Sequence, residues 1–384
     1  MVLAIRRGSS LRRVARRFHV SHTTVRRWAV RLQGQRLDRA DWQDRPAGPP
    51  VAANRTPVRV ERTILAIRRR LQQDSPLGEH GAAAIHRELL QRQLSHVPCV
   101  RTIGRILGRH GILDGRRRVR RPAPPRGWYL PPVAAQQAEL DSFDTITDLV
   151  IQGGQDVTVL TGISLHGALA ASWPAGKITA QTVVEKLLEH WAAFGCPAYV
   201  QFDNDTIFQG AHQWADSFGR VTRCCLQLGV TPVFVPPREP GFQAHIEAFH
   251  GRWQRAVWRR FHHRHLRDLC RRNGDFLEAL RQHLAPRVAA APPRPALPHN
   301  FVPDYQRPLA GQVIFLRRTD GQGRTECLGH RWLVDPLWPH RLVRLEVDLT
   351  TSRIRIYKLR RREPDWQPLV KTVRYRVPRT RFLE

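Results

Sequence analysis

The sequence predicts a multidomain chain: all-α units at the N-terminus, a central α/β domain with a mixed sheet, and a small antiparallel β barrel-like module at the C-terminus. Three observations support this. Apolar residues recur at helical spacing up to about residue 110. Strand-like runs lead into helices from Val133 onward, and apolar and polar residues alternate after Gly311. With 384 residues, the chain is long enough for several domains with their own cores.

Residues 1–34 are predicted to form helices around a tight turn. Apolar residues at helical spacing mark the first of the two main helices: Leu11, Val14, Ala15 and Phe18. Ser21 can cap the next helix, in which Trp28 is expected to belong to the apolar stripe. The opposite face of that helix carries polar and basic side chains: His22, Thr23, Arg26 and Arg27. This pattern resembles a helix-turn-helix whose second helix enters the major groove of DNA.

A second helical, helix-turn-helix-like unit is predicted at 57–114, after a linker at 35–56 that is rich in Gly, Pro and Asp. Its third helix carries Arg101, Arg105 and Arg109, whose spacing of four places them on one face, where they are expected to bind DNA. A basic Pro/Arg linker at 115–132 follows and could lie along a DNA backbone.

The central domain is predicted at 133–285. Strand-like runs such as 156–160 and 198–202 alternate there with helices over Ala180–Phe194 and Ile246–Phe261. An Ala/Pro linker is expected at 286–308. Residues 309–384 are predicted to form the barrel-like module, with its arginines outward and in contact with DNA.

The distribution of charge indicates a polyanionic partner. The net charge is +31, yet it is uneven: 29 basic and 8 acidic residues lie in 1–130, 5 and 12 in 131–250, and 29 and 12 in 251–384. An acidic centre between basic arms is expected if the centre binds cations and the arms bind phosphates. Double-stranded DNA is therefore the expected partner.

The six cysteines show no paired metal-ligand spacing, and we expect reduced, mostly buried thiols. No apolar run reaches the roughly 18–20 residues that span a bilayer. The sequence thus predicts a cytoplasmic protein with no membrane partner.

Three acidic residues stand in positions suited to holding metal ions. Asp141 begins a strand-like run, Asp203 ends another, and Glu247 lies early in a predicted helix. Carboxylates on rigid elements can hold two Mg²⁺ or Mn²⁺ ions, and such a pair serves phosphodiester chemistry. Asp144 is the main alternative to Asp141 as the first of the three metal ligands.

Residues of about 133–260 resemble the catalytic core of integrase-type DDE insertion-sequence transposases, the ribonuclease-H-like fold shared with retroviral integrases. The motifs are Ala-Glu-Leu-Asp at 138–141, Asp-Asn-Asp at 203–205 with Phe208, and Pro240 followed by Gln-Ala at 243–244 and Glu247. The resemblance implies that Asp141, Asp203 and Glu247 are the catalytic metal ligands. It also implies a bacterial, nucleoid-associated enzyme that acts as a homo-oligomer on DNA.

Two departures from the family pattern leave alternatives open. Asp205 replaces the usual glycine, and it could crowd the turn or add a further carboxylate near the site. The separation between the second and third carboxylates that is common in the family would select Glu239. Glu239 lies among prolines that disfavour a helix, so Glu247 is preferred. An insertion around Gly210–Arg220 would account for the longer separation. His245 and His250 flank Glu247 and are expected to be ordinary polar-face residues.

The expected function is a transposase that cleaves the 3′ ends of its element at the inverted repeats and joins them to target DNA. One alternative is a transposase-derived DNA-binding regulator with an inactive core. Another is a metal-dependent nuclease without strand transfer.

Overall fold

The computed structural model describes residues 1–44, 56–92, 97–113, 125–211, 214–239, 241–378 and 382. The chain forms two compact units, Met1–Val60 and Glu61–Glu384. Parts of the linkers expected at 35–56 and 115–132, together with Pro240 of the third motif, lie outside the described residues.

The N-terminal unit consists of short helices around a small core. They are α1 (Val2–Arg6), α2 (Leu11–Arg17), α3 (His22–Arg31) and the 3₁₀ turn η1 (Leu37–Arg39). The Ser21 side chain accepts a hydrogen bond from the amide of Thr24 at 3.1 Å, which confirms the predicted cap of the third helix. Val14, Ala15 and Val25 form the buried core. Phe18 is 44 % exposed and does not belong to it.

Three helices begin the second unit: α4 (Val58–Asp74), α5 (Ala82–Gln91) and α6 (Val100–Arg109). Their apolar faces supply buried side chains at the predicted helical spacing, including Ile64, Ile67, Ile85, Leu89, Ile103, Ile106 and Leu107. Among the described residues, no helix is both long enough and apolar enough to cross a membrane.

A nine-stranded mixed sheet dominates the second unit, in the order β11-β10-β9-β6-β5-β4-β1-β2-β3. Its first five strands are β1 (Leu140–Val150), β2 (Asp156–Ser164), β3 (Ala170–Ala175), β4 (Tyr199–Phe202) and β5 (Thr231–Phe234). The first three pair antiparallel, while β4 and β5 run parallel to β1. The predicted mixed sheet is thereby confirmed.

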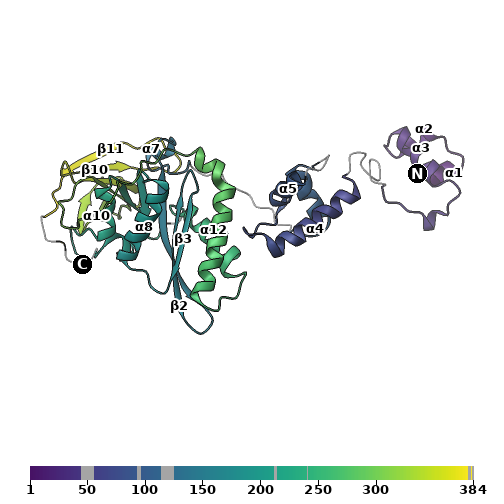
Figure 1. Cartoon of the computed structure of the whole chain (residues 1–384). Coiled ribbons are helices and arrows are strands. Elements are labelled where there is room, and N and C mark those ends of the chain that lie inside the picture. The colour runs from purple at the N-terminus through teal and green to yellow at the C-terminus, as the bar shows by residue number, and fades with distance from the viewer. Residues whose placement is uncertain are drawn as a thin grey trace. The chain divides into compact units, whose positions relative to one another are not determined.

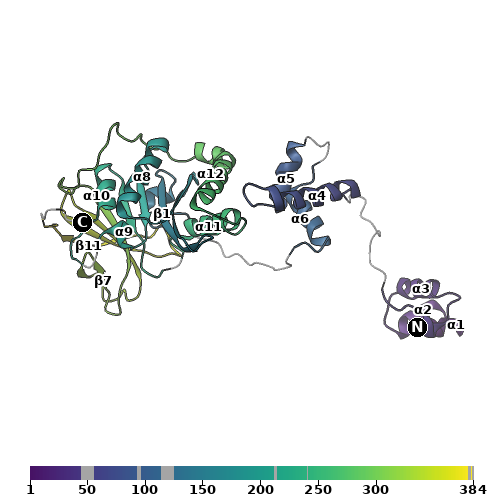
Figure 2. The same cartoon turned by 60° about the horizontal axis from the view of Figure 1, so that its bottom comes forward.

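Helices cover both faces of this sheet (Figures 1 and 2). On one face lie α8 (Ala180–Phe194), α9 (Thr206–Gln209) and α10 (Arg220–Gln227), in a core with Phe143 and Phe202. On the other lie α11 (Ala244–Trp253), the π-helix η2 (Gln254–Trp258) and α12 (Leu266–Ala289), in a core with Ile146. The helix predicted at Ala180–Phe194 is confirmed. The short helix α7 (Pro131–Ala134) precedes β1.

The C-terminal strands differ from the expected separate barrel-like module. They are β6 (Gln312–Arg318), β7 (Arg324–Cys327), β8 (His330–Leu333), β9 (Leu342–Asp348), β10 (Arg353–Lys358) and β11 (Leu369–Arg374). β6 pairs in parallel with β5, so β6, β9, β10 and β11 continue the central sheet. Arg344 on β9 was expected to point outward, but it is buried and donates to the carbonyl of Tyr129 at 2.6 Å.

Both proline-rich segments expected as linkers contain packed residues. At the end of 115–132, Trp128, Tyr129 and Leu130 are buried against the sheet. In 286–308, α12 extends to Ala289, and Pro295 accepts a hydrogen bond from the amide of Cys196 at 2.7 Å. The residues around Arg294 therefore form a strap along the core, and we call 292–298 the proline strap.

Candidate active site

Asp144 and Asp203 stand beside each other on the sheet. In the parallel pair of β1 and β4, Ser142 lies opposite Gln201. Continuing this register by two residues places Asp144 beside Asp203, immediately after β4. Because side chains alternate between the faces of a strand, Asp144 shares its face with Ile146, which packs in the α11 core. The two carboxylates therefore lie on the side of the sheet that α11 covers.

Asp141 lies on the opposite face, and the structure does not bring it together with Asp203 and Glu247 as the sequence analysis expected. Its carboxylate is only 1 % exposed and forms a two-pronged ion pair with Arg294, at 2.8 and 2.6 Å. The indole Nε1 of Trp191 also donates to it, at 3.2 Å. These donors occupy both carboxylate oxygens, so Asp141 acts as a buried anchor for the proline strap.

One glycine allows the strap to approach. Gly195 has a φ of +81°, and a Cβ there would lie 2.8 Å from the Cβ and the carbonyl oxygen of Arg294. The carbonyl of Gly195 accepts a hydrogen bond from Nε of Arg294 at 3.0 Å. Only glycine suits this conformation and this contact, and the strap thereby delivers the guanidinium to Asp141.

The carboxylate of Asp144 interacts electrostatically with those of the other candidate ligands. Burial, together with the nearby carboxylates of Asp203, Glu247 and Asp205, raises the pKa of Asp144 to about 7, against the opposing effect of a hydrogen bond from the amide of Thr145. Burial also raises the pKa of Asp203, with the carboxylate of Asp205 adding to it. Asp203, Glu247 and Asp205 thus each lie near enough to Asp144 to affect its ionisation.

Glu247 and Asp205 occupy different places in this cluster. Glu247 is exposed in the first turn of α11, while its neighbour Ile246 is fully buried and holds the helix on the sheet. Asp205 is the N-cap of α9 and accepts a hydrogen bond from the amide of Ile207 at 2.9 Å. Its φ of −63° needs no glycine, so aspartate does not crowd the turn.

Glu239 lies elsewhere. It sits in a loop after β5, and its carboxylate pairs with Arg318 at 2.6 Å. No coupling between Glu239 and Asp144 is found among the described residues. The structure therefore groups Glu247, and not Glu239, with the other carboxylates.

The cluster suits divalent cations in its chemistry. Its donors are carboxylate oxygens, which Mg²⁺ and Mn²⁺ prefer. Within the described part of the chain, no lysine or arginine forms an ion pair with Asp144, Asp203 or Glu247. In the same part, however, no three acidic, histidine or cysteine side chains lie close enough together to hold an ion. Without a cation, mutual repulsion opposes the closer approach that a metal site requires.

The two histidines of α11 are more than polar-face residues. Nε2 of His245 donates a hydrogen bond to the carbonyl of Ser164 at 3.1 Å, so the ring carries its proton on Nε2. Nε2 of His250 lies 2.7 Å from the hydroxyl of Thr161. Burial lowers the pKa of both imidazoles to about 4. Both rings are therefore neutral near pH 7.

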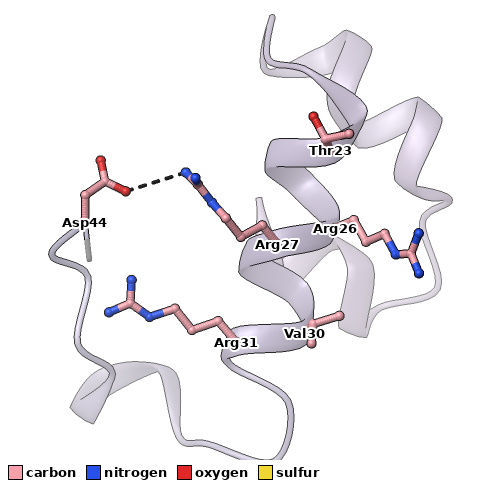
Figure 3. A pocket seen from close by; sticks show the side chains of 6 residues that line it. All are labelled: Thr23, Arg26, Arg27, Val30, Arg31 and Asp44. Carbon is pink, nitrogen blue, oxygen red and sulfur yellow. Dashed lines mark ion pairs between the residues drawn. The ribbon is translucent and has the colours of Figure 1, made fainter. Parts of the chain in front are cut away.

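The residues of α3 expected to bind DNA are exposed. His22, Thr23, Arg26 and Arg27 all lie on its solvent face. An open pocket of about 620 Å³ runs along this helix, lined by Thr23, Arg26, Arg27, Val30, Arg31 and Asp44. Figure 3 shows Arg27 turned toward Asp44, with which it pairs at 3.6 Å, and Arg26 turned away from Asp44.

On α6, the three expected DNA-binding arginines do not share one environment. Arg101 and Arg105 are exposed. Arg109 is exposed as well, but it pairs with the buried carboxylate of Glu61 at 2.5 Å, and Nε2 of His110 approaches the same carboxylate at 3.2 Å. Arg109 therefore has a structural partner within the helical unit.

Comparisons with solved structures find retroviral integrases. The catalytic core domain of BIV integrase is 16% identical, covering 37% of this chain and 83% of that chain, with a TM-score of 0.28. The integrase chain of a simian T-cell lymphotropic virus intasome, in complex with a PP2A regulatory subunit, is 13% identical over 71% of this chain and 92% of that chain, with a TM-score of 0.33.

A third is the HTLV-2 integrase catalytic core domain, in complex with magnesium and in a dimeric form. It is 10% identical over 37% of this chain and 86% of that chain, with a TM-score of 0.27. No protein-family model and no curated protein sequence matches the chain.

Proposed function

We propose that this chain is a metal-dependent polynucleotidyl transferase, and specifically an integrase-type transposase, with Asp144, Asp203 and Glu247 as its metal ligands. One observation supports the proposal: Asp144 lies on the α11 side of the sheet near the carboxylates of Asp203 and Glu247, and burial together with these carboxylates raises its pKa to about 7. This set replaces Asp141 of the sequence analysis, because Arg294 and Trp191 occupy the Asp141 carboxylate.

Each side chain of the site would have its own role in holding the metal ions. Asp144 and Asp203 would hold the ions between them, and Glu247 would complete the site from α11. When bound, Mg²⁺ or Mn²⁺ would neutralise charge on the phosphate and activate the attacking oxygen. Neutral His245 and His250 would add no positive charge to compete with the cations.

Double-stranded DNA is the proposed substrate. The net charge of +31 favours a polyanion, and the exposed His22, Thr23, Arg26 and Arg27 of α3 supply groove-binding and phosphate-binding groups. We propose that α3, with Arg101 and Arg105 of α6, binds the ends of the element. Two ends must meet for joining, which favours a homo-oligomer on DNA.

The alternative is a DNA-binding regulator with an inactive core. The observation in its favour is that, in the described residues, the carboxylates are not close enough together to hold an ion. It predicts sequence-specific binding of DNA that is unaffected by Mn²⁺ and is accompanied by no cleavage.

The test uses the full chain. Duplexes that it selects from a random library are rebuilt as labelled ends and incubated with a supercoiled plasmid and Mg²⁺. We expect strand transfer by the wild type and none by Asp144→Asn. Specific binding without cleavage would support the regulator, and cleavage without joining would support a nuclease. Full activity of Asp144→Asn would contradict the proposed ligand set.

A further inference from the structure

A chain of two partly buried hydrogen bonds connects the helix of Glu247 to the strand of Asp144. The hydroxyl of Thr161 on β2 donates to the backbone carbonyl of Asp144 at 2.8 Å. Nε2 of His250 on α11 lies 2.7 Å from the same hydroxyl oxygen. Thr161 is fully buried and directly opposite Asp144 in the antiparallel pair of β1 and β2.

The protons along this chain have only one consistent arrangement. A carbonyl oxygen can only accept, so the single hydroxyl proton of Thr161 is used on Asp144. The second bond then requires His250 to donate from Nε2. His250 is thus held as the Nε2–H tautomer, and burial favours this neutral ring by lowering the pKa of the imidazole to about 4.

The geometry makes this chain a direct link between α11, which carries Glu247, and the backbone of Asp144. His250 lies three residues after Glu247, so both project from neighbouring turns on one side of α11. Thr161 is β-branched and has few rotamers, which limits how far the link can bend. Phe249 and Trp253 are buried in the core beneath α11. His245 also bonds from α11 to β2, at Ser164, but His250 bonds to Thr161, the residue directly opposite Asp144.

We infer that His250 is a positioning residue that acts through Thr161, fixing the rotation and height of α11 so that Glu247 faces Asp144. The inference rests on the proposed function, because its purpose is to hold two metal ligands in place. Neither His250 nor Thr161 is proposed to touch an ion or DNA.

Four substitutions separate the hydrogen bonds from general packing. Thr161→Val removes the hydroxyl at nearly constant volume, and Thr161→Ser retains it. His250→Asn shortens the side chain so that its amide cannot reach Thr161, whereas His250→Gln places an amide donor near the position of Nε2. His245→Asn is the matched control, since His245 is also on α11 and partly buried, but bonds to Ser164 and not to Thr161.

The main measurement is Mn²⁺ affinity by isothermal titration calorimetry on the full chain. Loss of a residue that orients a ligand typically weakens metal binding about 10- to 100-fold. We expect His250→Asn and Thr161→Val each to weaken it at least about tenfold. The double variant should be no weaker than either single variant, because both break the same link. Thr161→Ser and His250→Gln should bind within about threefold of wild type, as should His245→Asn.

Urea unfolding without metal supplies the second readout. If the link exists, the changes in unfolding midpoint caused by Thr161→Val and His250→Asn should not add up in the double variant. The changes caused by Thr161→Val and His245→Asn should add up, because these two residues do not bond to each other. A purely structural role would lower the midpoint of His250→Asn and leave Mn²⁺ affinity of the folded protein unchanged. That result would overturn the inference.

Failure of the inference and failure of the proposed function give different results. If Asp144→Asn loses Mn²⁺ binding while His250→Asn binds as wild type, the metal site stands and the positioning role is wrong. If Asp144→Asn itself binds Mn²⁺ as wild type, the proposed function falls and the inference with it.

Discussion

Asp141 and Asp144 belong to the same strand but face opposite sides of the sheet. Three residues is an odd step along a strand, so one side chain enters the α8 core and the other the α11 side. Asp141 is compensated by Arg294, whereas Asp144 is surrounded by other carboxylates. The two aspartates should therefore respond in opposite ways to the same substitution.

The first prediction compares Asp141→Asn with Asp144→Asn. Removing the charge of Asp141 leaves the buried guanidinium of Arg294 uncompensated, which should cost on the order of 3 kcal/mol of unfolding free energy. Asp144→Asn should leave the metal-free protein as stable as wild type or more so near pH 8, but should abolish Mn²⁺ binding and strand transfer.

Urea denaturation and Mn²⁺ calorimetry on both variants check this. A stable Asp141→Asn that has lost Mn²⁺ binding, beside an Asp144→Asn that retains it, would restore Asp141 as the ligand.

The second prediction concerns pH. The pKa of Asp144 is raised to about 7 from an ordinary value near 3.8, so between these values the folded protein holds a proton that the unfolded chain has released. The contribution of Asp144 to the unfolding free energy of the metal-free protein is therefore highest at about pH 4 and below. It is lost as the pH rises through 7, by at most about 4 kcal/mol.

The buried histidines act in the opposite direction. His190, His245 and His250 have pKa values lowered to about 4, so they reduce stability as pH falls below about 6.5. They are common to wild type and Asp144→Asn, and the difference between the two proteins isolates Asp144. Urea midpoints from pH 5 to 8 measure it, and a difference that does not change with pH would contradict the assigned pKa.

At the scale of elements, α6 carries two exposed arginines that are proposed to bind DNA and one that forms an ion pair within the protein. Its apolar residues face α4 and α5, and its basic residues were expected to share the outer face. The carboxylate of Glu61 on α4 is buried, and it draws Arg109 at the end of α6 into an ion pair. Similar spacing in sequence therefore does not give similar roles.

The third prediction separates these roles. Arg101→Ala and Arg105→Ala should leave thermal stability within about 0.5 kcal/mol of wild type. Each should also reduce the slope of log affinity for DNA against log salt by about 1. Arg109→Ala should instead destabilise the helical unit by about 1–3 kcal/mol, because it removes an ion-pair partner of a buried carboxylate.

Salt titrations of DNA binding and thermal melts on the same preparations distinguish the two outcomes. An Arg109→Ala protein with unchanged stability and a reduced salt slope would show that Arg109 binds phosphate after all.

At the scale of the whole molecule, one sheet joins the acidic centre to the basic C-terminal strands. Val313, Phe315, Val343 and Leu345 of these strands are buried in the same core as Phe143 and Phe202. The strand pairing of β5 with β6 crosses the boundary that the sequence had suggested near residue 309. The core is thus incomplete without its C-terminal strands.

The fourth prediction tests this continuity. A chain truncated after Ala310 exposes the edge of β5 and part of the apolar core, so it should lose its cooperative unfolding transition and aggregate. Removal of residues 1–56 is the matched control, because Met1–Val60 is a compact unit of its own. That truncation should leave the main transition unchanged. Circular dichroism melts measure both, and a cooperative melt after truncation at Ala310 would indicate an independent module.

Local signals in the sequence predicted several elements correctly. The apolar stripe of Ala180–Phe194 and the cap at Ser21 depend on residues within one or two turns, and the structure contains both. The mixed sheet followed from strand-like runs that lead into helices. The uneven charge pointed to an acidic centre between basic arms, and it needs no tertiary information at all.

The choice between Asp141 and Asp144 depended on long-range register. A signal for it exists in the sequence, since Phe143-Asp144 and Phe202-Asp203 are the same pair of residues, and β1 and β4 align them. Only the fold shows that Arg294, 153 residues away, neutralises Asp141. Likewise, only the fold shows that β6 joins β5 and that His250 reaches Thr161. Periodicity in the sequence shows which face of an element is apolar. Contacts between residues distant in the sequence depend on the packing of the whole core, so only the tertiary structure determines them.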